Sequence, residues 1–184
     1  MSRIISLVVP LFLLLSGCVS KHQAVQAPGN MAVSVAGSMA VLDSTEVTGV
    51  PEDLATGLVD LCAERNLLPK AVPPASFSDA FAAKRTTQHR LALISDVSTD
   101  TDLLFLVETT VAYYSQMNGR YRWTTDVDAT ISPRNDLSQA FSAHFQVPVF
   151  LEHFREKEAA ALDAGIPLLE RRLGALLDAY LGGL

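Results

Sequence analysis

The strongest constraint on the fold of this chain is a β-hairpin that the sequence predicts between Asp102 and Ile131. Two long runs rich in β-branched and aromatic residues flank Asn118-Gly119, and Asn-Gly is the dipeptide that best fits a two-residue type I′ turn. Such a turn sets the register, because the residues on either side of it must pair. Counting outward from it predicts the pairs Met117–Arg120, Tyr114–Trp123, Ala112–Thr125, Thr110–Val127 and Leu106–Ile131.

This register divides the hairpin into two faces. One face is mostly apolar, and we expect helices to cover it: Leu104, Leu106, Ala112, Tyr114, Trp123, Val127, Ala129 and Ile131. The other face is expected to be partly solvated, because it mixes apolar and polar side chains: Phe105, Val107, Val111, Tyr113, Arg122, Thr124, Asp126, Asp128 and Thr130. An antiparallel sheet with one covered face follows from this division.

Helices are predicted on both sides of the hairpin in the sequence. A helix over 51–66 starts near Pro51 and gathers apolar side chains on one face: Leu54, Leu58, Leu61 and Cys62. A longer C-terminal helix, ended by Gly182-Gly183, carries a continuous apolar stripe at spacings of three and four: Leu162, Ile166, Leu169, Leu173, Leu176 and Tyr180. The stripe is expected to pack across the sheet rather than to form a dimer seam.

The remaining segments give weaker signals. Residues 39–42 and 143–150 read as strands, 43–49 as a polar loop and 69–74 as a proline-rich extended connection. A short helix is expected from Ser76 to about Lys84, and 87–97 is ambiguous between helix and strand. The predicted fold class is α+β: a small, mostly antiparallel sheet with a long central hairpin, covered on one face by helices that include the C-terminal helix.

An apolar run from Ile4 to Leu15 precedes the residues Leu15-Ser16-Gly17-Cys18. The run is shorter than the roughly 20 residues needed to cross a bilayer and contains Pro10, so a cleaved signal is favoured. The four residues match the lipobox of bacterial lipoproteins. That resemblance implies cleavage before Cys18 and acylation of its side chain and new amine, which would anchor the protein to a lipid bilayer.

The residue after the cysteine bears on the membrane that would hold this anchor. In enterobacterial lipoproteins an Asp at this position favours inner-membrane retention, and here the residue is Val19. The resemblance therefore implies an outer-membrane protein with its domain facing the periplasm. The expected organisation is a signal peptide (1–17), a lipidated cysteine with a flexible tether (18–36) and a single globular domain (37–184). As a flexible coil, the tether would reach about 23 Å.

Charge and motifs argue against several functions. The chain has a net charge of −6 and no basic stripe, so nucleic acid is not an expected partner. It has no Gly-rich phosphate loop, Gly-x-Ser-x-Gly elbow, Cys-x-x-Cys pair or His-Glu-x-x-His motif. We therefore expect no enzymatic activity, cofactor or metal. With Cys18 lipidated, Cys62 is the remaining thiol and is expected to be a buried small hydrophobe.

A few titratable residues leave a functional interpretation open. Asp126 and Asp128 share a strand face and could hold a cation or act as an acid/base pair, although a solvated face is favoured. His144 and His153 could bind a metal only if the fold brings them together. Glu108 is expected on the apolar face opposite Ala129, which requires a bulge, an arginine partner or a functional cleft.

The end of the hairpin is the best candidate for a binding surface. Residues 113–123 concentrate aromatic, Met and Arg side chains, which are the types enriched in interface hot spots. Tyr114 and Trp123 are expected to form a cross-strand aromatic pair. The candidate partner-binding residues are Tyr113, Met117, Arg120, Tyr121 and Arg122.

The order of the predicted elements resembles that of small α/β domains in Gram-negative envelope proteins. These include the penicillin-binding-protein activator lipoproteins, the curli-secretion lipoprotein and the amino-terminal domain of the Tol translocation protein. The resemblance implies a non-enzymatic accessory in cell-envelope assembly or maintenance that docks onto another envelope protein. The alternative is a lipoprotein that binds a small ligand or a glycan such as peptidoglycan, and a pocket lined by Tyr113, Trp123 and Asp126 would favour it. A hydrolase is a distant third.

Overall fold

The computed structural model describes residues 24–41, 47–73, 86–153 and 158–184. The predicted lipobox and the predicted short helix near Ser76 lie outside these residues. No helix in the described part of the chain combines the length and the apolar character needed to cross a membrane.

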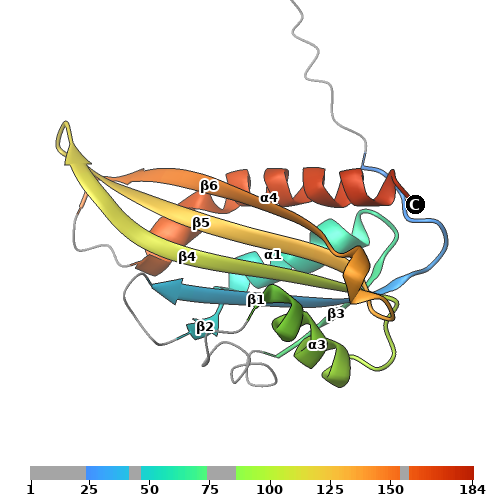
Figure 1. Ribbon diagram of the computed structural model, residues 1–184. Coiled ribbons are helices and arrows are strands. Elements are labelled where there is room, and N and C mark those ends of the chain that lie inside the picture. The colour runs from blue at the N-terminus through green and yellow to red at the C-terminus, as the bar shows by residue number, and fades with distance from the viewer. Residues whose placement is uncertain (1–23, 42–46, 74–85, 154–157) are drawn as a thin grey trace, which may run out of the picture.

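A six-stranded mixed sheet forms the centre of the fold (Figure 1). Its strands are β1 (Ala32–Val41), β2 (Val47–Gly49), β3 (Leu68–Ala71), β4 (Leu103–Met117), β5 (Arg120–Pro133) and β6 (Phe141–Leu151). The order is β2-β1-β4-β5-β6, and β3 also pairs with β1. β1 runs parallel to β3 and β4, whereas the other pairings are antiparallel. The predicted α+β class is confirmed, and the short strands β2 and β3 stand where the sequence predicted only loop and extended chain.

Helices lie on both faces of this sheet. α1 (Glu52–Ala63) and α4 (Glu158–Leu181) cover one face, which we call the inner face, and α3 (Thr87–Val97) lies on part of the opposite, outer face (Figure 1). A short 3-10 helix, η2 (Leu137–Gln139), connects β5 to β6. The helices α1 and α4 confirm the predicted ones, and α3 resolves the ambiguous segment as a helix that the prediction of one covered face did not include.

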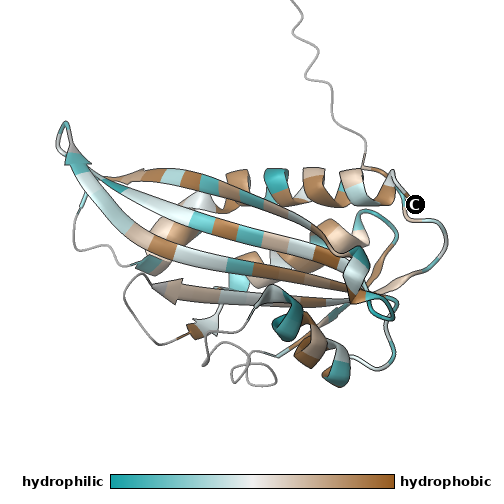
Figure 2. Cartoon of the chain, viewed as in Figure 1, coloured by the Kyte–Doolittle hydropathy of each residue, from teal (hydrophilic) through white to brown (hydrophobic). Residues whose placement is uncertain are grey.

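Two hydrophobic cores hold these layers together. The larger one lies between the inner face and the pair α1 and α4, and its fully buried side chains include Leu54, Leu58, Phe105, Val111, Ile131, Leu162 and Leu173. The smaller one packs Leu91 and Ile94 of α3 against Ala36, Leu104 and Leu106. Figure 2 shows the hydrophobic residues of β4 gathered in the half of the strand that lies away from the hairpin turn.

The predicted register of the hairpin is wrong by one residue along most of its length. Met117 does pair with Arg120, but the register shifts between Tyr113 and Ser115, so that Tyr113 rather than Tyr114 faces Trp123. This bulge at Tyr114 reverses the faces assigned to the rest of β4, because side chains alternate along a strand. Phe105, Val107 and Val111 therefore lie in the larger core, and Leu104 and Leu106 lie beneath α3.

The predicted tether is also wrong from Ala24 onward. Ala32–Ala36 belong to β1, a strand in the interior of the sheet. Their small and β-branched side chains suit this position, and those of Val33 to Ala36 are buried there. Before β1, the Ala27 side chain is buried and its N–H donates to the Arg65 carbonyl oxygen at 2.9 Å. The segment from Ala24 is thus part of the folded domain.

An ion pair with a buried arginine and a partly buried aspartate fixes this segment on the helices. The Arg65 side chain, 6% exposed, reaches from the end of α1 to Asp178 of α4, with Nε–Oδ1 and Nη2–Oδ2 distances of 2.9 and 3.0 Å. Arg65 also donates to the carbonyl oxygens of Leu61 and Gly174. The same Asp178 Oδ1 accepts the Val25 N–H at 2.9 Å, so one carboxylate joins α1, α4 and the entering chain.

Candidate functional site

The β4–β5 turn confirms the predicted type I′ geometry. Asn118 and Gly119 both have positive φ, 51° and 77°, as this turn requires at its two central positions. A Cβ at Gly119 would meet no atom within 4 Å, so φ rather than space favours glycine there. The turn and the ends of both strands extend beyond the rest of the domain (Figure 1).

Aromatic side chains pack together on the inner face of the hairpin end. The ring of Tyr113 lies edge-on to Trp123, with centroids 5.6 Å apart, and 6.5 Å from the ring of Tyr121. Trp123 is buried and Tyr121 packs against the larger core, whereas Tyr113 is 42% exposed. Of the five predicted docking residues, Tyr113 and Tyr121 therefore also have a packing role.

A different cluster lies on the outer face of the same hairpin end. The guanidinium carbon of Arg122 lies 4.3 Å from the ring centroid of Tyr114, which is 65% exposed. Phe150 of β6, 50% exposed, is the cross-strand neighbour of Arg122. The Arg122 Nε is buried without a hydrogen-bond partner among the described residues. We call Tyr114, Arg120, Arg122 and Phe150 the tip patch.

The tip patch overlaps only in part with the prediction. Arg120 is exposed beside the turn and Arg122 lies on the outer face, as a docking role requires; the Met117 side chain is outside the described part of the structure. Tyr114 was expected in the core, and the bulge instead turns it outward. The predicted docking residues did not include Phe150, because it lies on another strand. The predicted strand at 143–150 was the one signal that concerned it.

Further along the outer face, polar side chains form a row across three strands. Glu108 faces Asp128 across β4 and β5, and Asp128 faces His144 across β5 and β6. The His144 Nδ1 lies 2.9 Å from Asp128 Oδ1, and Gln146 donates to Asp126 Oδ1 at 2.7 Å. Asp126 and Asp128 do share a face, and both have cross-strand partners there.

The sequence led us to expect either a bulge, an arginine partner or a functional cleft to account for Glu108. The structure shows both an arginine partner and the bulge at Tyr114. Arg90 of α3 contacts it with an Nε–Oε1 distance of 2.6 Å, and both side chains are less than one-fifth exposed. Burial raises the pKa of Glu108, the charge and hydrogen bond of Arg90 oppose that rise, and the nearby Asp128 adds to it. Glu108 lies on the outer face opposite Asp128, not opposite Ala129 as expected.

The described residues offer little support for a metal or ligand site near the hairpin. Within the described ranges, no three His, Cys, Asp or Glu side chains are arranged to hold a metal ion. His144 lies on β6 and His153 lies beyond its end. Trp123 faces the helices while Asp126 faces outward, because side chains alternate along β5. Tyr113, Trp123 and Asp126 therefore cannot line one pocket.

Cys62 is a buried, free cysteine in the larger core. Burial raises the pKa of its thiol to about 12, although the positive charge of Arg65 opposes this rise. The prediction of a buried small hydrophobe is confirmed.

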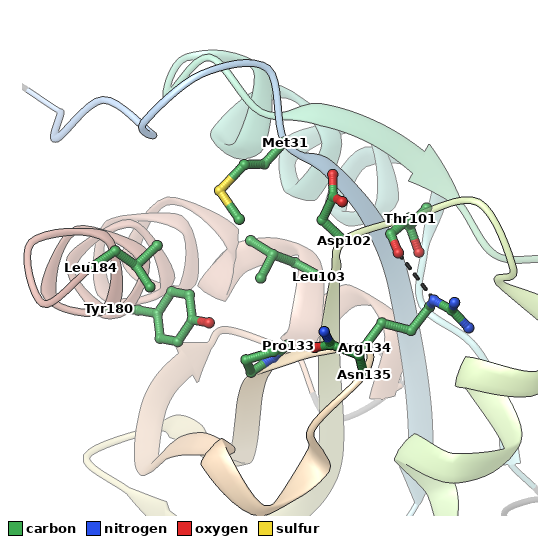
Figure 3. Close-up of a pocket in the computed structure, with 9 residues that line it drawn as sticks. All are labelled: Met31, Thr101, Asp102, Leu103, Pro133, Arg134, Asn135, Tyr180 and Leu184. Atoms are coloured by element: carbon green, nitrogen blue, oxygen red, sulfur yellow. Dashed lines mark hydrogen bonds between the residues drawn. The ribbon is translucent and has the colours of Figure 1, made fainter.

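A pocket that the sequence did not indicate lies at the end of the domain opposite the turn (Figure 3). It has a volume of about 440 Å³. Met31, Leu103, Pro133 and Leu184 supply apolar surface, while polar groups come from the residues just before β4, the residues after β5 and Tyr180 of α4. These residues are far apart in the sequence, so no local pattern could have revealed the pocket.

Comparison with known proteins shows a similarity of fold. No family model matches the sequence, and no curated protein matches it. The hypothetical protein CT253 from Chlamydia trachomatis is similar in structure, with a TM-score of 0.54 and 10% identity over 84% of this chain and 99% of that one. This likeness concerns the fold alone.

Two other structures are similar at TM-scores below 0.5. Lipoprotein GNA1162 from Neisseria meningitidis has a TM-score of 0.45 and 12% identity, covering 79% of this chain and 99% of its own. The C-terminal domain of LpoB from Salmonella enterica has a TM-score of 0.33 and 10% identity, covering 67% of this chain and 84% of its own.

Proposed function

We propose that this protein is a lipid-anchored lipoprotein of the outer membrane whose periplasmic domain acts as a non-enzymatic accessory in cell-envelope assembly or maintenance. It uses the tip patch to dock onto another envelope protein. The observation that carries the proposal is that the entering chain and the β4–β5 turn lie at opposite ends of the domain (Figure 1).

The short chain between Cys18, the proposed anchor, and the domain supports a position of this end of the domain close to the bilayer. Cys18 precedes Ala24 by six residues, and six extended residues span at most about 21 Å. Val25 is held on Asp178 near the end of α4, and the start of β4 lies beside Ala32, the first residue of β1. The 15 residues of β4 extend roughly 50 Å from there, so the turn is presented away from the membrane.

The chemistry of the tip patch favours an acidic partner surface. From Thr109 to Thr125 the sequence has no Asp or Glu, although the whole chain is acidic. No carboxylate among the described residues forms a salt bridge with Arg120 or Arg122. A guanidinium stacked on an exposed tyrosine is suited to a partner carboxylate, and Tyr114 and Phe150 add apolar contact area.

A triple variant tests this proposal. Tyr114→Ala, Arg120→Ala and Arg122→Ala together should shift the melting temperature by no more than a few degrees, since Tyr114 and Arg120 are exposed and Arg122 is half-buried at the end of the hairpin. A photoreactive amino acid at Asn118 should cross-link an envelope protein in intact cells, and the triple variant should abolish that product. The matched control carries the photoreactive residue at Gln139, an exposed position at the other end of the domain.

The outcomes separate a docking role from a structural one. A triple variant that folds and still gives the Asn118 product in the same amount would show that the tip patch is ordinary surface. A variant that unfolds would show that its side chains are structural. Replacement of Arg120 and Arg122 by Glu should weaken cross-linking further, because an acidic partner would then be repelled.

A further inference from the structure

The pocket at the anchored end of the domain carries an inference that goes beyond docking at the tip. It lies beside Met31, just before β1, and beside the C-terminal end of α4 (Figure 3). This is the end at which the chain enters from the predicted lipid anchor. The tip patch is at the far end of β4, so the two surfaces do not overlap.

Tyr180 provides a hydrogen-bond donor that lacks a partner in this pocket. The residue is 9% exposed, and its hydroxyl is buried without a hydrogen-bond partner among the described residues. Burial raises the pKa of the phenol, so it remains protonated at neutral pH. Phe141 packs against the ring, with centroids 6.3 Å apart. Because buried polar groups are nearly always satisfied, a group bound here should supply an acceptor.

Two opposite charges lie at the polar side of the pocket, and a backbone group of another residue binds one atom of each: the exposed carboxylate of Asp102 and the guanidinium of Arg134, which extends toward Thr101 and away from Tyr180 (Figure 3). Asp102 Oδ2 accepts the Ala32 N–H at 2.8 Å. The Nε of Arg134 donates to the Thr101 carbonyl oxygen at 3.1 Å, and the backbone N–H of Arg134 donates to the Asp102 carbonyl oxygen. Among the described residues, no hydrogen bond or salt bridge engages Asp102 Oδ1 or the terminal nitrogens of Arg134, although the charge of Arg134 also acts on Asp100. An isolated anion would be repelled by Asp102, and an isolated cation by Arg134.

We propose that this pocket binds the zwitterionic phosphoethanolamine headgroup of a membrane phospholipid. The ammonium group is held by Asp102 and the phosphate by Arg134, Tyr180 donates to an oxygen of the phosphoglycerol ester, and the acyl end contacts Met31 and Leu184. The expectation that the lipid comes from the adjacent bilayer rests on the lipid anchor of the proposed function. The headgroup chemistry rests on the pocket alone.

Methionine-methyl NMR on the purified full-length protein in dodecyl maltoside tests the headgroup directly. Titration with glycerophosphoethanolamine should shift the Met31 methyl signal saturably and leave that of Met39 in place. Affinity should be about tenfold higher than for ethanolamine or glycerophosphate alone, because each lacks one charge pair. Tyr180→Phe keeps the ring, and thus the packing, and should weaken binding about fivefold.

Charge variants with a matched control complete the test. Asp102→Asn should remove the preference for glycerophosphoethanolamine over glycerophosphate, whereas Asp100→Asn, two residues away and paired with Lys70, should keep it. The proposal would be overturned if the Met31 methyl signal did not shift, or if the unaltered protein bound glycerophosphoethanolamine and glycerophosphate with equal affinity. Short-chain dihexanoyl phosphatidylethanolamine should bind more tightly than the soluble headgroup, and equal binding would exclude a membrane lipid as the occupant. Neither result depends on cross-linking from Asn118, which tests the tip.

Discussion

The carboxylate of Glu108 shows how one residue is placed by contacts that are remote in the sequence. It lies between a cation, Arg90 of α3, and an anion, Asp128 of the neighbouring strand. Its burial would be unfavourable without the arginine, because an isolated charge loses its hydration. The ion pair therefore explains a polar residue beneath α3 without invoking catalysis.

The pKa shift of Glu108 predicts a pH dependence of stability. Because burial raises the pKa of Glu108 above its ordinary value of 4.5, the folded protein keeps this proton to higher pH than the unfolded chain does. Its contribution is fully present below pH 4.5 and is lost as the pH rises through the raised pKa. The difference in unfolding free energy between the wild type and Glu108→Gln should therefore fall as the pH rises from 4. A difference that increases with pH would contradict this, and urea titrations across the range measure it.

At the scale of the elements, the apolar stripe of α4 carries the packing of the inner face. Leu162, Leu169 and Leu173 are fully buried against the sheet and α1. Leu173→Asp should lower the free energy of unfolding by about 3 kcal/mol or more, since it places an unpaired charge in the core. Val111→Asp should do the same from the sheet side. Ala175→Asp, on the exposed side of the same helix, is the control, and thermal or urea unfolding distinguishes them.

A near-native melting temperature for Leu173→Asp would mean that α4 does not pack on the sheet. The comparison with Ala175→Asp is needed because aspartate also lowers helix propensity, by less than 1 kcal/mol. The difference between the two variants isolates the cost of burial.

The hairpin shows what could be predicted from sequence and where prediction stopped. Asn118-Gly119 identified the turn, and the pairing nearest to it was correct. One extra residue, Tyr114, then shifted the register and reversed the faces of β4. Nothing local in the sequence distinguishes a bulge from regular alternation, because Tyr113 and Tyr114 are chemically equivalent. The long helices were predictable from their periodicity, and the predicted strand at 39–42 overlaps the end of β1, whereas the rest of β1 and the short strands β2 and β3 depend on pairing between distant segments.

The candidate sites also differ in whether local sequence or contacts between distant segments define them. The cluster of aromatic and arginine residues predicted an exposed surface at the hairpin end, where Tyr114 and Arg120 are exposed, and its docking role stays a prediction. Phe150 and the pocket around Tyr180 required the three-dimensional arrangement, because their members come from separate elements. The tether was predicted to be too long, because its small residues, which are typical of linkers, also fit an interior strand such as Ala32–Val41.

For the whole molecule, the proposed anchor and the folded domain should be separable. Cys18→Ala should release the protein from the membrane fraction, because the acyl chains would no longer be attached. The melting temperature of the domain should stay unchanged, since the fold begins at Ala24. Sedimentation of membranes at high salt measures the first effect, and a variant that remains in the pellet would disprove the lipid anchor. Ser16→Ala, which keeps a small residue before the cysteine, is the control.

The ion pair between Arg65 and Asp178 connects the entering chain to both helices, and its loss should affect the whole domain. Asp178→Ala would leave the buried guanidinium of Arg65 without its carboxylate and would remove the acceptor of the Val25 N–H. Removing one partner of a buried pair typically costs about 3 kcal/mol, and hydrogen exchange should increase at Val25 and Ala27. The double variant Arg65→Met/Asp178→Leu should recover most of the stability, because no charge remains buried, but the Val25 amide should still exchange rapidly. If the double variant also restored protection at Val25, the carboxylate would not be what holds the entering chain on α4.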